Sequence, residues 1–481
     1  MIQRTKNAIR TMLPKNTFVY GVSLLVGGTA GAQVLTVLAA PLLTRLYSSE
    51  DFGLLSVYTS LLALIGVISS LRYELAIPLP EDDGEAANVA VLSLIFVGVN
   101  TLLTSIIVLL LRQPVIDLLG VPALASYLWL LPVGVLLSGV YKVFNYWSVR
   151  TKRFSTIAGT NLHQVLASLS IQLAAFKLGG IALLFGQVAS QSVGTTSLGR
   201  SALTNAGFRQ VSWGGIVLGA KRYRQFPILS TWGGLIDVAS TKLPLLVISG
   251  IFGVSEAGFL SIAERILQMP ASLLGRAISQ VFLSGAADAN RKGELKLLVQ
   301  KVSSNLIHIG LPPAVLIFLT GPDLFSFIFG DNWRQAGEFA RWMTPWIYLQ
   351  FISSPLSVVY LATEKIAQSV IWQITLFIVN ISALFIGVFI NEVLATIMIL
   401  SAANTACYII LFIWIARLSN NSLSTIFSPM LFAALTATVC VIPILFVKFS
   451  FPNSTELMIF AFIVSVVLII GRYFSLFTNK P

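Results

Sequence analysis

The segment TFVYGVSLLVGGTAGAQVLTVLAAPLLTRL, residues 17–46, decides the fold class of this protein. It contains no acidic residue, and its one basic residue, Arg45, stands next to its last position. About 20 predominantly apolar residues suffice to cross the ~30 Å hydrocarbon core of a bilayer, so this segment predicts a transmembrane helix. Residues 30–32 resemble a signal-peptide cleavage site, but the apolar run continues well beyond them, and we expect an uncleaved first helix.

Apolar segments of the same kind follow one another along the chain to Phe477. Of the 481 residues, 56% are hydrophobic and only 10% are charged, and the mean hydropathy is +0.86. Because a soluble surface normally takes roughly a quarter or more of its residues as Asp, Glu, Lys and Arg, this composition argues against a soluble fold. We predict an all-α integral membrane protein with about fourteen transmembrane helices. The expected spans are 18–45, 52–76, 87–111, 124–147, 157–178, 181–203, 227–251, 256–283, 303–321, 339–362, 367–390, 393–416, 426–447 and 456–477.

The basic residues are distributed as membrane topology signals usually are. The chain has 31 Lys and Arg against 19 Asp and Glu, which gives a net charge of +12. The basic residues stand in short clusters between apolar segments, not on one patch, so we expect no nucleic-acid partner. If the N-terminus is cytoplasmic, most of these residues fall in cytoplasmic connections, and the positive-inside rule then places both termini in the cytoplasm.

An internal repeat indicates two lobes. The stretch LYSSEDFGLLSV, residues 46–57, resembles IFGVSEAGFLSI, residues 251–262, and Gly258 follows Gly53 by 205 residues. About six expected helices fit in one period, and because six is even, the two halves should share one orientation and be related by an axis along the membrane normal. We predict an N-terminal lobe at 1–205, a C-terminal lobe at 206–420 and an appended helix pair at 421–481.

Two arginines lie inside the expected span 256–283. Arg265 and Arg276 are eleven residues apart, which in an α-helix is three turns plus about 20°, so both project from one face about 16 Å apart. Gln268 falls on the same face. A charge at mid-bilayer costs roughly 2.5 to 3.5 kcal/mol on insertion scales, and two cations on one face repel each other unless an anion or acidic neighbours lie between them. We expect these three residues to line a cavity that receives a negatively charged substrate.

Further charges lie in the neighbouring expected spans. Asp237 belongs to a polar face of the span 227–251, with Lys242 beside it and Pro244 able to break the helix. We expect Lys242 to contact the substrate, and Asp237 and Glu264 to carry a coupled proton or sodium ion. Two structural alternatives remain open: Lys242 snorkels to the membrane surface, and Glu264 only forms an ion pair.

Arg72, Tyr73 and Glu74 close the second expected span on the cytoplasmic side. We expect Arg72 to bind substrate, with a solvated helix end as the alternative. Polar residues also recur at helical spacing on the spans 157–178 and 181–203, where they could face a cavity or form interhelical contacts.

Other motifs are absent from the sequence. It has no G-x-x-x-x-G-K-[ST] phosphate loop, so no ATPase is built in. Its two histidines and two cysteines stand singly, which supports neither a metal site nor a disulfide framework, and we expect no cofactor. The longest expected outside loop, residues 322–341, is too short to form a domain.

Several segments resemble the bacterial polysaccharide flippases, the lipid-linked oligosaccharide translocases of the multidrug/oligosaccharidyl-lipid/polysaccharide exporter superfamily. The resemblance covers essentially the whole chain, although its motifs are too degenerate to name a sugar. It rests on residues 44–53 (TRLYSSEDFG), 72–77 (RYELAI), 223–227 (YRQFP), 242–244 (KLP) and on Gly258, Arg265 and 267–270 (LQMP).

This resemblance implies a secondary transporter, not an enzyme. It implies a V-shaped pair of six-helix lobes that opens alternately to the two sides of the bacterial inner membrane. The substrate would be an undecaprenyl-pyrophosphate-linked oligosaccharide moved to the periplasmic leaflet for O-antigen, capsule or exopolysaccharide synthesis. Membrane lipids, a polysaccharide polymerase and a chain-length regulator are the partners that it suggests.

Two other function classes stay open. A multidrug or other small-solute exporter of the same superfamily would typically carry an acidic residue in its first helix and about twelve helices, and residues 17–46 contain none. A membrane enzyme, such as a polysaccharide polymerase or ligase, would be expected to carry a large outside loop with several charged groups.

Overall fold

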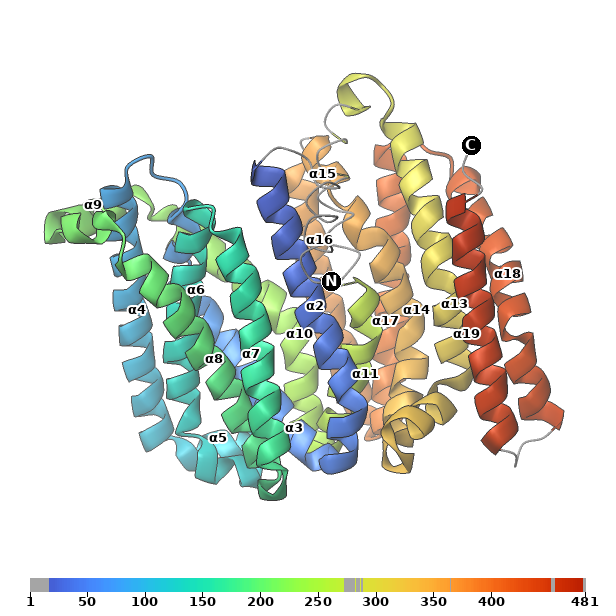
Figure 1. Cartoon of the computed structure of the whole chain (residues 1–481). Coiled ribbons are helices and arrows are strands. Elements are labelled where there is room, and N and C mark those ends of the chain that lie inside the picture. The colour runs from blue at the N-terminus through green and yellow to red at the C-terminus, as the bar shows by residue number, and fades with distance from the viewer. Residues whose placement is uncertain are drawn as a thin grey trace, which may run out of the picture. The chain divides into compact units, whose positions relative to one another are not determined.

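The computed structural model describes residues 17–271, 282, 286, 289–363, 365–450 and 455–478. Within these ranges every regular element is a helix. The chain divides into two compact units, Met1–Ser261 and Ile262–Pro481, which are described separately here (Figure 1).

The helices follow the expected spans closely. In unit 1 they are α2 (Thr17–Leu46), α3 (Ser49–Ile68), η1 (Tyr73–Ala76), α4 (Asp83–Leu110), α5 (Arg112–Leu119), η2 (Pro122–Tyr127), α6 (Leu130–Arg150), α7 (Phe154–Ala174), η3 (Phe176–Leu178), α8 (Gly180–Leu203), η4 (Ala206–Gln210), α9 (Trp213–Arg222), η5 (Phe226–Ser230), α10 (Thr231–Phe252) and the first part of α11 (Val254–Pro270). In unit 2 the rest of α11 is followed by α13 (Leu295–Phe329), η7 (Asp331–Trp333), α14 (Arg334–Leu356), α15 (Val359–Ala362), α16 (Ile366–Ile390), α17 (Val393–Leu418), α18 (Leu423–Ser450) and α19 (Thr455–Thr478).

The all-α membrane fold is confirmed. Each expected span overlaps one of these helices, and in the described part of the chain eight helices are long and apolar enough to cross a membrane. The number of helices that cross stays a prediction.

Pro244 and Pro322 both lie inside helices. Helix α10 continues through Pro244 to Phe252, and α13 continues through Pro322 to Phe329, so the expected outside loop at 322–341 is largely helical. Neighbouring helices and local adjustments can satisfy the carbonyl groups that a proline frees in a membrane helix, so proline need not end such a helix.

The two repeat-related turns contact each other at one end of unit 1. A Cβ atom placed on Gly53 would lie 2.8 Å from the carbonyl carbon of Val254, and one on Gly258 would lie 2.8 Å from that of Ser49. Ser49 and Val254 are themselves 205 residues apart, so the contact is reciprocal, as a two-fold axis between the repeats requires. This geometry supports the repeat. The compact unit nevertheless extends beyond residue 205 to Ser261, since α10 packs on α3, and the repeat-based domain boundaries stay a prediction.

Polar residues of α7 hold the helices of unit 1 together. The Asn161 amide donates a hydrogen bond to Thr29 Oγ1 of α2 at 3.0 Å and accepts one from the Tyr141 hydroxyl of α6 at 3.2 Å. On α8, Gly186 and Gly194 leave room for the side chains of Gln172 and Gln164 of α7. Small residues and amides of this kind are typical of helix contacts inside membranes, so this polar row acts as interhelical contact.

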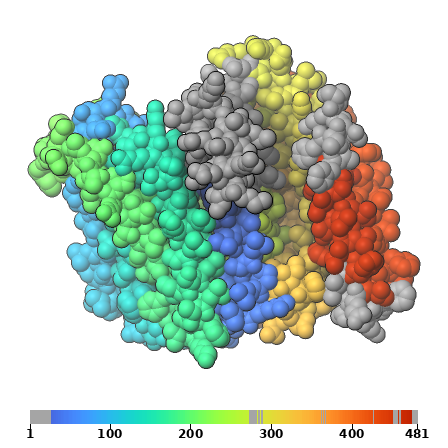
Figure 2. Space-filling view, in the orientation of Figure 1, coloured from blue at the N-terminus to red at the C-terminus, as the bar shows by residue number. Residues whose placement is uncertain are grey.

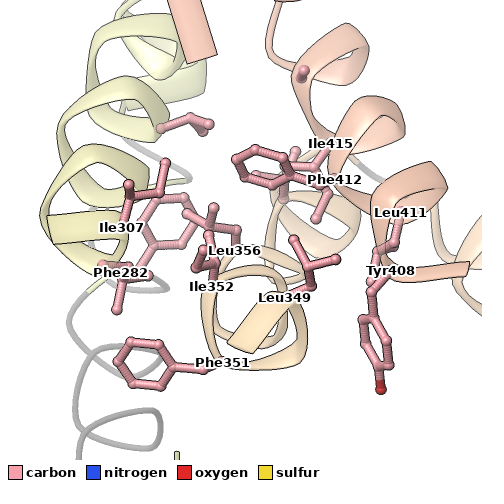
Figure 3. Packing of buried hydrophobic residues seen from close by; sticks show 14 of the residues in the cluster. Phe282, Ile307, Leu349, Phe351, Ile352, Leu356, Tyr408, Leu411, Phe412 and Ile415 are labelled. Carbon is pink, nitrogen blue, oxygen red and sulfur yellow. The ribbon is translucent and has the colours of Figure 1, made fainter. Parts of the chain in front are cut away.

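The core of unit 2 lies between α13, α14 and α17. Figure 3 shows the α14 side chains, including Ile352 and Leu356, between Ile307 of α13 and Phe412 of α17, all of them buried. Phe412 meets Phe427 of α18 edge to face, with ring centroids 5.5 Å apart. A second cluster joins α18 and α19 to α13. Close packing of this kind stabilises helix association in lipid, where apolar burial alone gives little driving force.

Candidate functional site

A strained turn after α3 positions Arg72. Helix α3 ends at Ile68, and Leu71 and Arg72 then adopt left-handed backbone angles, with φ of 49° and 62°. Neither residue is glycine, and each such conformation costs of order 1–3 kcal/mol. The Tyr73 amide closes the turn by donating to the Ser70 carbonyl at 3.1 Å, and η1 follows directly. Because both ends of this turn are held, Arg72 has a fixed position between α3 and η1.

Glu74 is buried beside this turn, with 2% of its surface exposed. The hydroxyl of Ser70, which is fully buried, donates to the Glu74 carboxylate. The alternative of a solvated helix end is therefore wrong for Glu74. A buried carboxylate is costly unless a donor or a cation accompanies it.

Lys142 of α6 supplies that cation. Its ammonium group donates to the Gly66 carbonyl at 2.7 Å, and it interacts electrostatically with Glu74 and Arg72. The Gly66 carbonyl is in the last turn of α3, where the helix dipole favours a positive charge. A Cβ at Gly66 would lie 3.0 Å from the ammonium nitrogen, so glycine leaves room for this contact.

The guanidinium of Arg72 lies against α10. A Cβ on Gly234 would lie 2.6 Å from Arg72 Cζ and 2.7 Å from its Nε, so any side chain here would require the guanidinium to move. The Nε atom is buried and has no hydrogen-bond partner within the described residues. Gly234 belongs to the polar face of α10 that also carries Asp237. Arg72 therefore has unused donor capacity beside this face.

Arg72, Glu74 and Lys142, with Ser70 and Gly234, form what we call the Arg72 cluster. It holds two cations and one carboxylate, so it has a surplus positive charge. Buried charge is stable only when it is paired, and a guanidinium binds phosphate oxygens through two parallel donors. The arrangement suits a bound anion, and a phosphate in particular.

The predicted site residues fall in both units. In unit 1, the Asp237 side chain is exposed and that of Lys242 is half-buried, both on α10. In unit 2, Arg265 and Gln268 project from α11 with exposed side chains, and Glu264 is half-buried. Arg276 lies outside the described residues. The structure thus brings Arg72 to the α10 face of Asp237, while the predicted roles of all seven residues stay predictions.

Lys142 and Ser70 are the members that sequence reasoning missed. In the sequence alone, Lys142 stands close to one end of the expected span 124–147, where a basic residue is typical of a topology signal. Its position inside that span was the available signal, since intramembrane charges usually have a function.

The acidic loop after η1 is fastened to α6. Arg150 at the end of α6 pairs with Asp83 at 2.9 Å and donates to the carbonyls of Pro80 and Glu81. An ion pair near the surface stabilises by only about 0–1 kcal/mol, but four hydrogen bonds from one guanidinium, two of them to Asp83, fix the loop geometry. This loop leads directly into α4, which begins at Asp83.

Comparison with known proteins gives the family. Residues 42–338 match the family model of polysaccharide biosynthesis proteins. The chain belongs to this family. The matched residues include the whole Arg72 cluster, whereas α15 to α19 lie beyond them. No curated protein matches the sequence.

Solved structures show which fold this family member has. It is similar to the lipid II flippase MurJ in an inward closed conformation, with 12% identity, a TM-score of 0.72 and coverage of 96% of this chain and 98% of MurJ. It is also similar to an inward-facing multidrug resistance MATE transporter of the MOP superfamily, with 15% identity, a TM-score of 0.53 and coverage of 83% of this chain and 96% of that transporter. A MOP transporter from Pyrococcus furiosus is similar as well, with 16% identity, a TM-score of 0.55 and coverage of 83% of this chain and 95% of that transporter. These proteins are transporters and not enzymes. The resemblance to polysaccharide flippases is confirmed, and the protein is a multi-pass membrane protein with a transporter fold.

Proposed function

We propose that this protein translocates undecaprenyl-pyrophosphate-linked oligosaccharide repeat units from the cytoplasmic to the periplasmic leaflet of the inner membrane. The product would supply O-antigen, capsule or exopolysaccharide synthesis. The observation that carries the proposal is the surplus positive charge of the Arg72 cluster in a member of the polysaccharide biosynthesis family, where the buried Arg72 Nε has no partner among the described residues. Pyrophosphate is the one strongly anionic part of such a substrate, and a guanidinium recognises it well.

Each predicted residue has a part in this proposal. Arg72 and Lys142 bind the pyrophosphate from unit 1, with Lys242 as a further cation on α10. Arg265, Gln268 and Arg276 are further predicted donors to the substrate. The bias of Lys and Arg along the chain supports cytoplasmic termini, and it places the Arg72 cluster toward the cytoplasmic side, where the substrate is made. A polysaccharide polymerase and a chain-length regulator would act on the product.

A vesicle assay tests the translocation. Purified protein in sealed vesicles should accelerate the appearance of a lipid-linked oligosaccharide on the opposite leaflet, scored with an impermeant enzyme that modifies its terminal sugar. Vesicles without protein are the control. If the protein does not move the glycolipid but instead transports cationic dyes when an ion gradient is applied, the small-solute exporter is the correct function.

The energy source is a separate prediction. An inside-negative potential favours outward movement of pyrophosphate by roughly 2.3 kcal/mol per charge per 100 mV. Collapsing proton and sodium gradients at fixed potential should slow translocation further if Asp237 and Glu264 exchange a cation. Asp237→Asn should then remove that dependence, whereas Asp117→Asn, at an exposed carboxylate on α5, should retain it. If neither the proton gradient nor the sodium gradient affects the rate of translocation, and Asp237→Asn translocates like the parent protein, the two carboxylates have only a structural role.

A further inference from the structure

Helix α9 is a short amphipathic helix fastened across one end of unit 1, next to α4 (Figure 1). Its Ile216 and Gly219 are buried toward α4. Ser212 caps it, accepting a hydrogen bond from the Gly215 amide at 3.1 Å, and its own amide donates to Asn88 Oδ1 of α4 at 2.9 Å. A Cβ on Gly215 would lie 2.6 Å from Asn88 Cγ, so the α9 backbone packs directly against the Asn88 side chain.

The other end of α9 is held by Glu85. Arg222 pairs with the Glu85 carboxylate at 2.7 Å, and the Tyr223 hydroxyl donates to the same oxygen at 3.3 Å. Burial, and then the Glu85 charge, raise the pKa of Tyr223, so its hydroxyl stays protonated and able to donate. With both ends anchored, α9 has a fixed rotation about its axis.

The outer face of α9 is apolar, and basic residues stand at its C-terminal end and in the turn that follows it. Trp213 is 73% exposed and Leu218 68%, with Val217 beside them. Lys221 and Arg224 are exposed and form no ion pair within the part of the chain that the structure describes. In the space-filling view, the green atoms of α9 stand out from the surface of unit 1 (Figure 2). An exposed tryptophan and leucine that face water would be unfavourable, so this face needs a partner.

The level of α9 identifies that partner. It meets α4 at Asn88 and Val89, and α4 ends at Leu110, about 32 Å further along at 1.5 Å per residue. This length matches the ~30 Å hydrocarbon core, and the exposed α4 side chains between these positions, such as Val99 and Leu102, are apolar. Helix α9 therefore lies at the level of the lipid headgroups.

We propose that α9 lies in the membrane interface and binds anionic lipid. Trp213, Val217 and Leu218 enter the acyl boundary, and Lys221 and Arg224 contact the negatively charged headgroups of the same leaflet. Each basic residue near an anionic surface strengthens the attraction about fivefold, which favours an anionic surface over a neutral one. If the partner of this face were a soluble protein, the exposed apolar residues of α9 would not need to lie at the level of the lipid headgroups. The proposal uses no residue of the Arg72 cluster and does not depend on the transported substrate.

A fluorescent label on α9 tests the proposal. Leu218→Cys is labelled with an environment-sensitive dye in a full-length protein carrying Cys407→Ala and Cys440→Ala, and reconstituted in phosphatidylcholine with or without phosphatidylglycerol. We expect blue-shifted emission that lipid-phase quenchers reduce, with severalfold stronger quenching when phosphatidylglycerol is present. The paired change Lys221→Gln and Arg224→Gln should abolish that difference. The matched pair Lys152→Gln and Arg200→Gln, exposed cations on other elements, should preserve it.

Three outcomes would overturn the proposal. Dye emission typical of an aqueous environment, quenched only by water-soluble quenchers, would show that α9 lies in solvent. Protection from both kinds of quencher would show that protein covers it. If quenching is the same with and without phosphatidylglycerol, and the Lys221 and Arg224 changes do not alter it, α9 does not bind anionic lipid.

Discussion

Arg72→Ala is expected to abolish translocation of the lipid-linked oligosaccharide, and with it surface polysaccharide, while the protein still inserts and accumulates. The guanidinium is the only group of the Arg72 cluster with a buried donor that lacks a partner in the described residues, so it has capacity left for substrate. A hydrogen bond to a charged group contributes about 1.5–3 kcal/mol, so losing one such bond weakens binding roughly 10- to 150-fold. Losing the charge as well leaves Lys142 as the one remaining cation of the Arg72 cluster.

Two further variants separate charge from geometry. Arg72→Lys keeps the charge but loses the planar pair of donors, so partial activity is expected. Gly234→Ala keeps every charge, yet its Cβ would lie 2.6 Å from Arg72 Cζ, so it should impair translocation by displacing the guanidinium. Arg112→Ala, at an exposed arginine on α5, is the matched control and should behave as the parent. Normal polysaccharide in a well-expressed Arg72→Ala strain would contradict the site.

The fold could be predicted from the sequence because lipid imposes one strong rule on the backbone. Every polar backbone group must be satisfied within the membrane, so apolar runs such as residues 17–46 become helices irrespective of finer detail. The same rule explains why α10 continues through Pro244 and why α13 continues through Pro322 into the expected outside loop. Proline breaks an isolated helix in water, but a packed membrane helix retains its hydrogen bonds on either side and continues.

The candidate site was only partly predictable. Arg72 was identifiable because its charge stands at a helix end beside Glu74. The approach of Lys142 from α6 and the space at Gly234 depend on how helices cross, and helical periodicity within one span does not encode that. The left-handed angles of Leu71 and Arg72 are also invisible in the sequence, since neither position carries glycine.

Helix α9 escaped prediction for a different reason. Its ten residues are too few for a membrane span and include three glycines, which lower helix propensity. Its helical state comes from tertiary contacts, with Ser212 as its cap and Glu85 as its second anchor. In the sequence alone, Lys221, Arg222 and Arg224 form one of the basic clusters between apolar segments that indicate topology.

Gly53→Ala and Gly258→Ala are expected to cause equal, severe loss of translocation. In each case the new methyl group would lie 2.8 Å from a backbone carbonyl carbon, of Val254 or Ser49, and even closer to the carbonyl oxygen. Backbone cannot rotate away as a side chain can, so the two repeat-related turns must separate. If transport requires the repeats to alternate between a conformation in which these two turns are in contact and one in which they are apart, neither variant could reach the conformation with the turns in contact.

The reciprocity of this contact makes the prediction sharper. One separation of the turns relieves both clashes, so the double variant should be little worse than either single one, which is the non-additive behaviour of coupled neighbours. Translocation rate and thermal stability of the purified proteins measure this directly. Gly98→Ala is the control, because a Cβ there would meet nothing within 4 Å, and it should match the parent. Additive losses from Gly53 and Gly258 would show two independent packing defects, and the repeats would then not share a single interface at this end of unit 1.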